Sequence, residues 1–330
     1  MRFGITAFIL TLALPLTALA QLGTVGSGGS QWFTVSVNPQ DPAPYGTATL
    51  SFLSDTLDLN NATLSVSVAG KKIYQGSVHS VAVTLGKGGS VTNVSVSISS
   101  GGATHSQSLS IVPQEVTLVA EPVSFAPPLY PGKSLVPLEG TVRVVAVANL
   151  RTGAGKTIDP SAVSYTWTVD GVQIANSSGI GKDTIMVASP LQYRTREVSV
   201  SVMSQDGSQV GGASLSLSPE QPSVKIYEND PLLGIRYDHA LSNSYSIAGA
   251  ESTLYAAPFS VSTTGANPLV QWFLNGSLAQ TGNSITLRPT GTGQGSASLS
   301  VVASGGQSTT ATAGLSLIFG ATSGSNFFGL

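Results

Sequence analysis

The chain has 330 residues, contains no cysteine, and carries a formal net charge of −2 with only 9% of its residues charged. Nucleic-acid binding needs a clustered basic surface, which 14 scattered lysines and arginines do not provide, so that class of function is excluded. Without disulfides each domain must be held together by its hydrophobic core, and a chain of this length is expected to form two or three domains.

The first twenty residues have the three parts of a secretory signal peptide. Met1-Arg2 is followed by an almost unbroken apolar run over 5–16, and Ala18-Leu19-Ala20 provides the small residues that signal peptidase recognises. We therefore expect residues 1–20 to be removed and the mature chain to be secreted or held in a cell envelope. The alternative is an uncleaved N-terminal anchor, although the run is shorter than the ~20 apolar residues that a spanning helix needs. No later stretch is long and apolar enough to span a membrane.

Beyond a glycine- and serine-rich leader at 21–30, expected to be flexible, apolar and small polar residues alternate almost everywhere. The segments 64–68, 94–98 and 198–202 all have a period of two. That period is typical of strands with one face on a core and one face in water. Short strands separated by Gly, Asn, Asp and Pro clusters indicate an all-β protein built of sandwiches or barrels.

One pattern recurs along the chain. Tyr-Thr-Trp-Thr-Val-Asp-Gly at 165–171 returns as Val-Gln-Trp-Phe-Leu-Asn-Gly at 270–276, and Trp167 and Trp272 are 105 positions apart (272 − 167). A fainter copy at 64–70 has Val66 in place of the tryptophan. Each copy is followed by a short strand and later by a closing strand of the form Leu-Ser-Ile or Leu-Ser-Leu, at 109–111, 215–217 and 315–317. Anchors that recur at similar spacings, between 100 and 106 residues, predict a tandem of three similar domains.

The strand and turn of the last two copies resemble the Tyr-x-Trp-x-x-x-Gly segment of PKD-like and other immunoglobulin-like repeats in bacterial surface and secreted proteins. The resemblance covers roughly 25 residues in each copy and implies that Trp167 and Trp272 lie in the core, on a central strand between two sheets. Asp-Gly and Asn-Gly supply the positive φ that a tight hairpin turn requires. The expected fold class is an all-β tandem of three immunoglobulin-like (PKD-like) β-sandwich domains after a signal peptide, an architecture that serves many activities.

Proline and glycine mark the expected domain boundaries. We place the first sandwich at 31–113, the second at 114–219 and the third at 220–319. Residues 320–330 form a flexible tail with an apolar end. This end is a candidate segment for docking on a protein partner, and otherwise it packs on the third sandwich or stays disordered. Its apolar residues are Phe327, Phe328 and Leu330.

Residues that carry catalysis are sparse in this chain. The histidines, His79, His105 and His239, show no metal-ligand spacing, and a zinc site is not expected without cysteine. No Gly-x-Ser-x-Gly elbow is present, and the Gly-Lys-Ser and Gly-Lys-Thr at 132–134 and 155–157 lack the rest of a phosphate loop. We therefore predict that the chain is not an enzyme and has no resident cofactor.

Charged and aromatic residues gather in one segment, 226–239. One hypothesis is a weak calcium site, because calcium takes several oxygen ligands from such loops. Its acids would be Glu228, Asp230 and Asp238. The other hypothesis, which the position just after a domain junction favours, is an inter-domain clamp in which aromatic rings pack across the second and third sandwiches and an arginine pairs with a carboxylate. The clamp would consist of Tyr227, Arg236 and Tyr237.

The proline-rich segment 122–137 is interpreted either as an exposed recognition loop or as an edge strand that proline protects from pairing. For the whole chain we expect an exported structural or adhesive protein of a cell surface, which contacts a protein partner or a second copy of itself. One alternative is a carbohydrate-binding accessory protein, which needs several aromatic side chains exposed together. Candidates for that platform are Tyr227, Tyr237, Tyr245 and Tyr255. A less favoured alternative is a hydrolase with a scattered active site.

Overall fold

The computed structural model describes residues 32–247, 249–264, 266–290, 294–305 and 309–320. The signal peptide, the leader and the apolar residues of the tail, Phe327, Phe328 and Leu330, lie outside these ranges. The described residues form strands β1 to β24, arranged in six sheets, with three single-turn 3-10 helices and no α-helix. The 3-10 helices are Leu59–Asn61, Pro160–Ala162 and Ala175–Ser177. Six sheets are the number that three two-sheet sandwiches need, and the expected all-β immunoglobulin-like class is confirmed.

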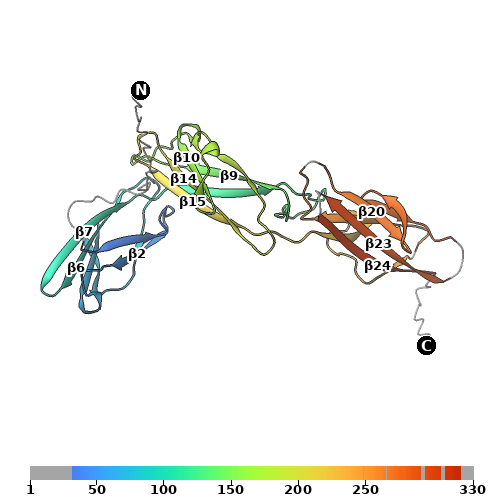
Figure 1. Ribbon diagram of the computed structural model, residues 1–330, viewed down its shortest axis with the longest axis horizontal. Coiled ribbons are helices and arrows are strands. Elements are labelled where there is room, and N and C mark those ends of the chain that lie inside the picture. Colours follow the sequence, from blue (N-terminus) through green and yellow to red (C-terminus); the bar gives the residue numbers. More distant parts are fainter. Residues whose placement is uncertain (1–31, 248, 265, 291–293, 306–308, 321–330) are drawn as a thin grey trace, which may run out of the picture. The chain divides into compact units, whose positions relative to one another are not determined.

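The strands follow the three sequence repeats, with β1–β7 in the first repeat, β8–β15 in the second and β16–β24 in the third (Figure 1). By its contacts the chain divides into two compact units, whose described parts are 32–35, 52–81 and 92–111 in the smaller unit and 36–51, 82–91 and 112–320 in the larger unit. The domain boundaries at 113 and 219 remain predictions.

A four-stranded antiparallel sheet in the order β4-β3-β6-β7 makes up most of the smaller unit. Its strands are β3 (Thr63–Val68), β4 (Lys71–Ser77), β6 (Thr92–Ser100) and β7 (Ala103–Ile111). Alternation buries one face of this sheet, where Leu64, Val66, Val96 and Ile98 have no exposed surface. A separate three-stranded sheet has the order β1-β2-β5. Its strands are β1 (Thr34–Asn38), β2 (Thr47–Leu53) and β5 (Val81–Thr84).

The second repeat has two sheets, in the orders β11-β10-β14-β15 and β13-β9-β8, with β12 also paired to β10. Their strands are β8 (Glu115–Pro122), β9 (Thr141–Asn149), β10 (Ser164–Val169), β11 (Val172–Gln173), β12 (Gly179–Ile180), β13 (Thr184–Ala188), β14 (Arg196–Met203) and β15 (Val210–Leu217). One apolar cluster joins the two sheets, with Val144 of β9 and Val200 of β14 packed around Tyr165 and Trp167 of β10. This repeat is therefore a sandwich with a single core.

The third repeat has sheets in the orders β17-β16-β19-β22 and β18-β24-β23-β20-β21. Their strands are β16 (Ser223–Asp230), β17 (Gly234–Ile235), β18 (Ser244–Ile247), β19 (Ser252–Phe259), β20 (Leu269–Leu274), β21 (Ser277–Thr281), β22 (Ser284–Leu287), β23 (Gly295–Gly305) and β24 (Thr309–Phe319). Trp272 lies in a core cluster that joins both sheets. Here β18 pairs in parallel with β24, so the closing strand of this repeat has a neighbour on each side.

The recurring sequence pattern corresponds to a recurring central strand. In β3, β10 and β20 the fourth residue is Val66, Trp167 or Trp272, and each of these three side chains is 0% exposed. Both indole N–H groups are satisfied inside the protein, because Trp167 Nε1 donates to Lys182 O (2.8 Å) and Trp272 Nε1 donates to Gly282 O (2.9 Å). A buried tryptophan needs such a partner for its polar atom. The large residue is therefore accommodated both by apolar packing and by hydrogen bonding.

The turn after each central strand also recurs. The two residues between the strands both have positive φ, at 50° and 80° for Asp170-Gly171, 48° and 82° for Asn275-Gly276, and 50° and 80° for Ala69-Gly70. These are the conformations of a two-residue type I′ hairpin turn. The carboxylate of Asp170 accepts from Glu197 N, and the amide oxygen of Asn275 accepts from Ser298 N, both at 2.9 Å. The first repeat has alanine at this position and lacks that side-chain acceptor.

We expect Trp167→Ala and Trp272→Ala each to lower the free energy of unfolding of its own repeat by about 3–5 kcal/mol, because each change leaves a cavity in a close-packed core. Scanning calorimetry of the mature chain would show a lower midpoint for the affected transition. Trp32→Ala is the control, since the Trp32 side chain is 46% exposed. Unchanged midpoints for the two buried positions would contradict their role in the core.

The turn of the first repeat gives a second prediction. Ala69→Asn is expected to raise the free energy of unfolding by about 1 kcal/mol, because Asn tolerates positive φ and adds one hydrogen-bond acceptor. Ala69 N already donates to Asn93 O, as Asp170 N and Asn275 N do to the matching residues of their repeats, so Asn93 N is the expected donor. Ala69→Gly relieves the positive φ without adding an acceptor. Equal stability of the two variants in urea denaturation would show that the added acceptor contributes nothing.

Candidate functional site

The exposed face of the β4-β3-β6-β7 sheet is covered with hydroxyl groups. Because the strands alternate and their register is fixed, hydroxyl residues of β3, β6 and β7 stand opposite one another in rows, such as Ser67, Ser95 and Ser108. We call this surface the hydroxyl face. It consists of Thr63, Ser65, Ser67, Ser95, Ser97, Ser99, Thr104, Ser106, Ser108 and Ser110. None of these side chains is ionisable at neutral pH, so the face is polar and uncharged.

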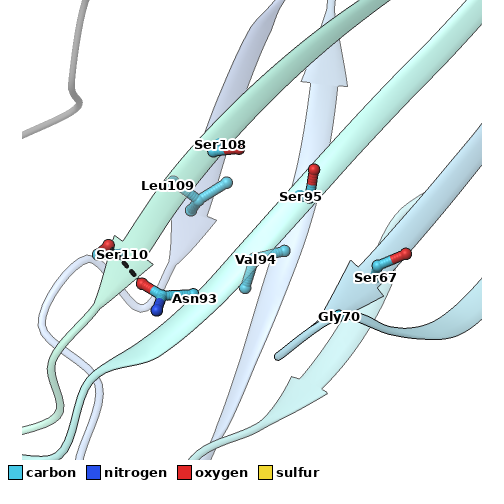
Figure 2. Close-up of a pocket in the computed structure, with 8 residues that line it drawn as sticks. All are labelled: Ser67, Gly70, Asn93, Val94, Ser95, Ser108, Leu109 and Ser110. Carbon is cyan, nitrogen blue, oxygen red and sulfur yellow. Dashed lines mark hydrogen bonds between the residues drawn. The ribbon is translucent and has the colours of Figure 1, made fainter.

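Neighbouring strands are linked across the hydroxyl face. Ser97 and Ser106 share a hydrogen bond of 2.8 Å between their hydroxyls, Ser99 and Thr104 share another of 2.8 Å, and Ser110 donates to Asn93 Oδ1 at 2.8 Å. The row of Ser67, Ser95 and Ser108 borders a shallow hollow of about 500 Å³ near the turn at Gly70 (Figure 2). Its lining offers only hydroxyl, amide and aliphatic groups, so it suits hydrogen-bonded contact with a neutral ligand.

The hydroxyl face ends at two different sheet edges. On one side β4 places Lys71 and Lys72, both exposed, along the edge. On the other side β7 pairs with β6, and no other described strand pairs with it. The nine residues of β7 include no Asp, Glu, Lys or Arg and no proline. An edge strand of this kind presents a row of main-chain N–H and C=O groups that a further strand can pair with.

Each of the three histidines has its own surroundings. His79 Nδ1 lies 3.1 Å from the Tyr74 hydroxyl and 3.2 Å from Ser77 O, whereas the ring of His105 is stacked on that of Trp32 at 4.3 Å between centroids. His239 is exposed in a turn of the third repeat. Within the described ranges no three His, Asp or Glu side chains are grouped so that they could hold a metal ion.

The acids proposed for calcium, Glu228, Asp230 and Asp238, each have a protein partner. Asp230 Oδ1 accepts from Leu232 N (2.7 Å) and Leu233 N (2.9 Å), and these hydrogen bonds lower the pKa of its carboxyl group. Both oxygens of Asp238 accept from Arg236 at 3.1 Å, and this contact lowers the pKa of Asp238. Glu228 Oε1 accepts from the Tyr245 hydroxyl at 3.1 Å. Each of the three acids therefore bonds to a different part of the protein, and they do not form one set of ligands around a common point.

The aromatic residues of the same segment do form one cluster. Tyr237 meets Tyr227 edge-on at 5.2 Å between ring centroids and Tyr130 of the second repeat at 5.6 Å. Its hydroxyl donates to Pro128 O (2.8 Å), again in the second repeat. Arg236, in contrast, pairs with Asp238 inside its own segment. Rings and one hydroxyl therefore connect the two repeats within the larger unit, while the predicted ion pair is local.

The same cluster answers the question of an aromatic platform for sugars. Tyr227 and Tyr255 are buried, at 6% and 7% exposure, and pack with Phe259. Tyr237 and Tyr245 are half-buried, with their hydroxyls bonded to the protein. The expectation that these four tyrosines could be exposed together is wrong. Tyr227, Tyr237 and Tyr255 pack in the cluster that includes Tyr130 of the second repeat, and Tyr245 packs against the core of the third repeat.

A main-chain contact, which the sequence did not reveal, accompanies the tyrosine cluster. Phe125 N donates to Val261 O (2.8 Å), Thr263 N donates to Val123 O (3.2 Å), and Ser124 forms a β-bridge with Ser262. The start of the proline-rich segment 122–137 therefore pairs through its main chain with residues 261–263 of the third repeat. The contact is formed by backbone groups, so no pattern of side chains in the sequence could predict it.

A second hollow, of about 470 Å³, lies in the larger unit beside Tyr45, which is 75% exposed. Around it Asn149 donates to Glu115 (2.8 Å) and Arg151 donates to Gly155 O (3.2 Å). An exposed aromatic ring beside amide, carboxylate and guanidinium groups is a combination that also occurs in polar ligand sites.

No family model and no curated protein matches the sequence. Among solved structures, the chain is similar to the three N-terminal domains of the highly immunogenic outer capsid protein (Hoc) of bacteriophage RB49, with 13% identity, 88% of this chain and 99% of that chain covered, and a TM-score of 0.24. It is also similar to the fibronectin(III)-like modules of Clostridium thermocellum CbhA (12% identity, 62% and 95% covered, TM-score 0.25) and to the central fibronectin-III array of RIM-binding protein (10%, 88% and 96%, TM-score 0.28). With TM-scores this low, the fold class rests on the sheets and cores described above.

None of the helices in the described ranges is long and apolar enough to cross a membrane.

The tyrosine cluster predicts a pH dependence. Burial raises the pKa of Tyr237 to about 12, whereas an exposed tyrosine titrates near 10. Between pH 10 and 12 the unfolded chain therefore loses this proton while the folded chain keeps it, so the free energy of unfolding falls across that window and is unaffected below it. Urea denaturation from pH 9 to 12 measures the fall.

Tyr237→Phe is expected to make that fall shallower, even though the variant is less stable at neutral pH because it lacks the bond to Pro128. Tyr193→Phe, at a side chain that is 92% exposed, is the matched control for removing a phenol. A slope for Tyr237→Phe equal to that of the parent chain would show that Tyr237 does not link stability to alkaline pH.

Proposed function

We propose that this chain is an exported structural or adhesive protein of a cell surface, which acts through protein–protein contacts of its tandem sandwiches and without catalysis. The observation that carries this proposal is β7, an uncharged edge strand of nine residues at the border of the hydroxyl face. Edge strands bind extended segments of other proteins through main-chain hydrogen bonds, with specificity from the side chains that alternate along the strand.

The rest of the chain supports a contact role. The β-bridge at 123–125 and 261–263 and the bond from Tyr237 to Pro128 tie the third repeat to the second, as a protein that bears or transmits force requires. Tyr227 and Tyr237 are the ring part of this proposed inter-domain clamp. Export is proposed from residues 1–20, and kinship with PKD-like repeats of bacterial surface proteins from the strand and turn around Trp167 and Trp272.

A carbohydrate-binding role is the second candidate, and the hollow beside Tyr45 is the observation that favours it. A sugar would stack on the exposed ring and exchange hydrogen bonds with Asn149, Glu115 and Arg151.

The proposal is tested first by export. The full chain, produced in a bacterial host, is expected to yield a mature protein that begins at Gln21 and is cut by protease added to intact cells. A chain without residues 1–20 is the control and should remain protected. Retention of the full-length chain inside the cell would contradict a surface role.

Binding is tested with beads that carry the mature chain, mixed with cells of the organism that encodes it. Protease treatment of the cells should abolish attachment, and periodate treatment, which destroys sugars, should leave it intact. The reverse pattern, together with loss of attachment for Tyr45→Ala, would replace the proposal with the carbohydrate-binding alternative. Beads coated with an unrelated protein of similar net charge control for nonspecific attachment, and equal attachment of both kinds of bead would contradict an adhesive role.

A further inference from the structure

We infer that β7 is a self-association surface, at which β7 of one copy pairs antiparallel with β7 of a second copy about a two-fold axis through Gln107. The inference rests on the proposed function and deepens it, since it names the partner as another molecule of the same chain and the contact as one strand. The joined sheets would run continuously through β4-β3-β6-β7 of both copies.

The choice of β7 follows from a comparison of the described sheet edges. Only three edge strands reach eight residues, β7, β8 and β15. β8 carries Glu115, Glu121 and Pro122, which oppose pairing. β15 is covered because it lies against β8, where its Gly211 packs closely on the side chain of Gln114. Of the shorter edges, β4 carries two lysines, and both β4 and β21 pair with their neighbours through a register shift that bends an edge. β7 has none of these protections.

The third repeat shows what covers the equivalent edge when the fold closes it. There the closing strand β24 is paired on its free side by β18, through residues Ser244–Ile247. In the first repeat the closing strand is β7, and no described strand takes the place of β18. The position that the third repeat fills from within its own chain is therefore taken by no described strand in the first repeat.

The sequence of β7 is compatible with itself. Side chains alternate between the two faces, so pairing that keeps the hydroxyl faces on one side must join residues of equal parity. Only an axis at Gln107 meets that condition and pairs all nine residues. It places hydroxyl opposite hydroxyl, as Ser106 with Ser108 and Thr104 with Ser110, which is the pattern already seen between β6 and β7. His105 then faces Leu109, and Gln107 faces its own copy.

The distribution of charge also favours a second copy of the chain as the partner of β7. β7 brings no Asp, Glu, Lys or Arg to the axis, so two copies meet without like-charge repulsion. The Lys71-Lys72 edge of β4 would repel its own copy, which leaves one edge of this sheet available. A single pair of edge strands buries less surface than a stable dimer needs, so the association is expected to be weak in solution and strong where many copies share one surface.

The absence of cysteine permits a direct test of the register. On the proposed axis the two Gln107 Cα atoms lie about 5 Å apart, within the range that a disulfide bridges, so mature Gln107→Cys should form a disulfide-linked dimer under mild oxidation. In the same dimer the two Cα atoms at position 106, one in each copy, lie about 8 Å apart, so Ser106→Cys should form far less disulfide-linked dimer. Ala279→Cys, on the exposed edge strand β21, is the control for collision.

A second measurement does not depend on cysteine. Sedimentation of the mature chain should show association that increases up to about 1 mM, the range of weak contacts. Ser106→Lys/Ser108→Lys should abolish it by placing like charges beside the axis, and Ala279→Lys/Gln280→Lys on β21 should not. Ser106→Ala/Ser108→Ala should retain most of the association, because the main-chain bonds remain. Circular dichroism confirms that each variant is folded.

A monomer throughout that range, or equal crosslinking of all three cysteine variants, would overturn the inference. Association that persists in the double-lysine variant would place the contact elsewhere and would also overturn the inference. Dimerisation seen only after removal of residues 21–30 would overturn it as well, because it would mean that this segment of the same chain takes the β7 edge. None of these results bears on export or on the attachment of beads to cells. Conversely, β7 pairing in a chain that never leaves the cell would contradict the proposed function alone.

Discussion

Each repeat depends on one completely buried residue in the middle of a central strand, Val66, Trp167 or Trp272. A chain without disulfides gains its stability from such burial, and a strand with the fully buried residue at its fourth position fixes which face of its sheet is inside. The type I′ turn that follows then sets the register of the hairpin, because both of its central residues need positive φ. Core and turn together determine where the polar face of each sheet lies.

These were also the features that could be predicted from sequence. The period of two, the Trp-to-Trp spacing and the Asp-Gly and Asn-Gly pairs reflect local rules, and the structure has strands and turns at those positions. The β-bridge between Ser124 and Ser262 could not be predicted, since backbone groups more than a hundred residues apart form it. The tyrosines of segment 226–239 were visible as a cluster, but composition could not tell an exposed platform from a buried contact. That distinction depends on Tyr130 and Phe259, which come from distant segments.

The candidate site shows a similar division. A serine at every second residue predicts the solvent-exposed side of a strand. The rows of hydroxyl groups, however, arise from the pairing register of three such strands, which the sequence of one strand does not contain. Whether an edge is open is likewise a property of topology. β7 and β24 have similar closing sequences, Leu-Ser-Ile and Leu-Ser-Leu, but of the two only β24 has a described parallel strand on its outer side. A sequence repeat can therefore conserve the core of a domain while its edges serve different purposes.

The distribution of tryptophan has a practical consequence. The chain has three tryptophans, one in each repeat, and they occupy three different surroundings. Trp167 and Trp272 are fully enclosed, whereas Trp32 is half exposed and stacked on His105 of β7, which pairs with β6 alone among the described strands. Replacing any two of them, with another large aromatic residue at the buried positions, would leave a single tryptophan that reports on one repeat. The emission of Trp32 would then follow events at the β7 edge, while the other two would follow the opening of their own cores, without any attached dye.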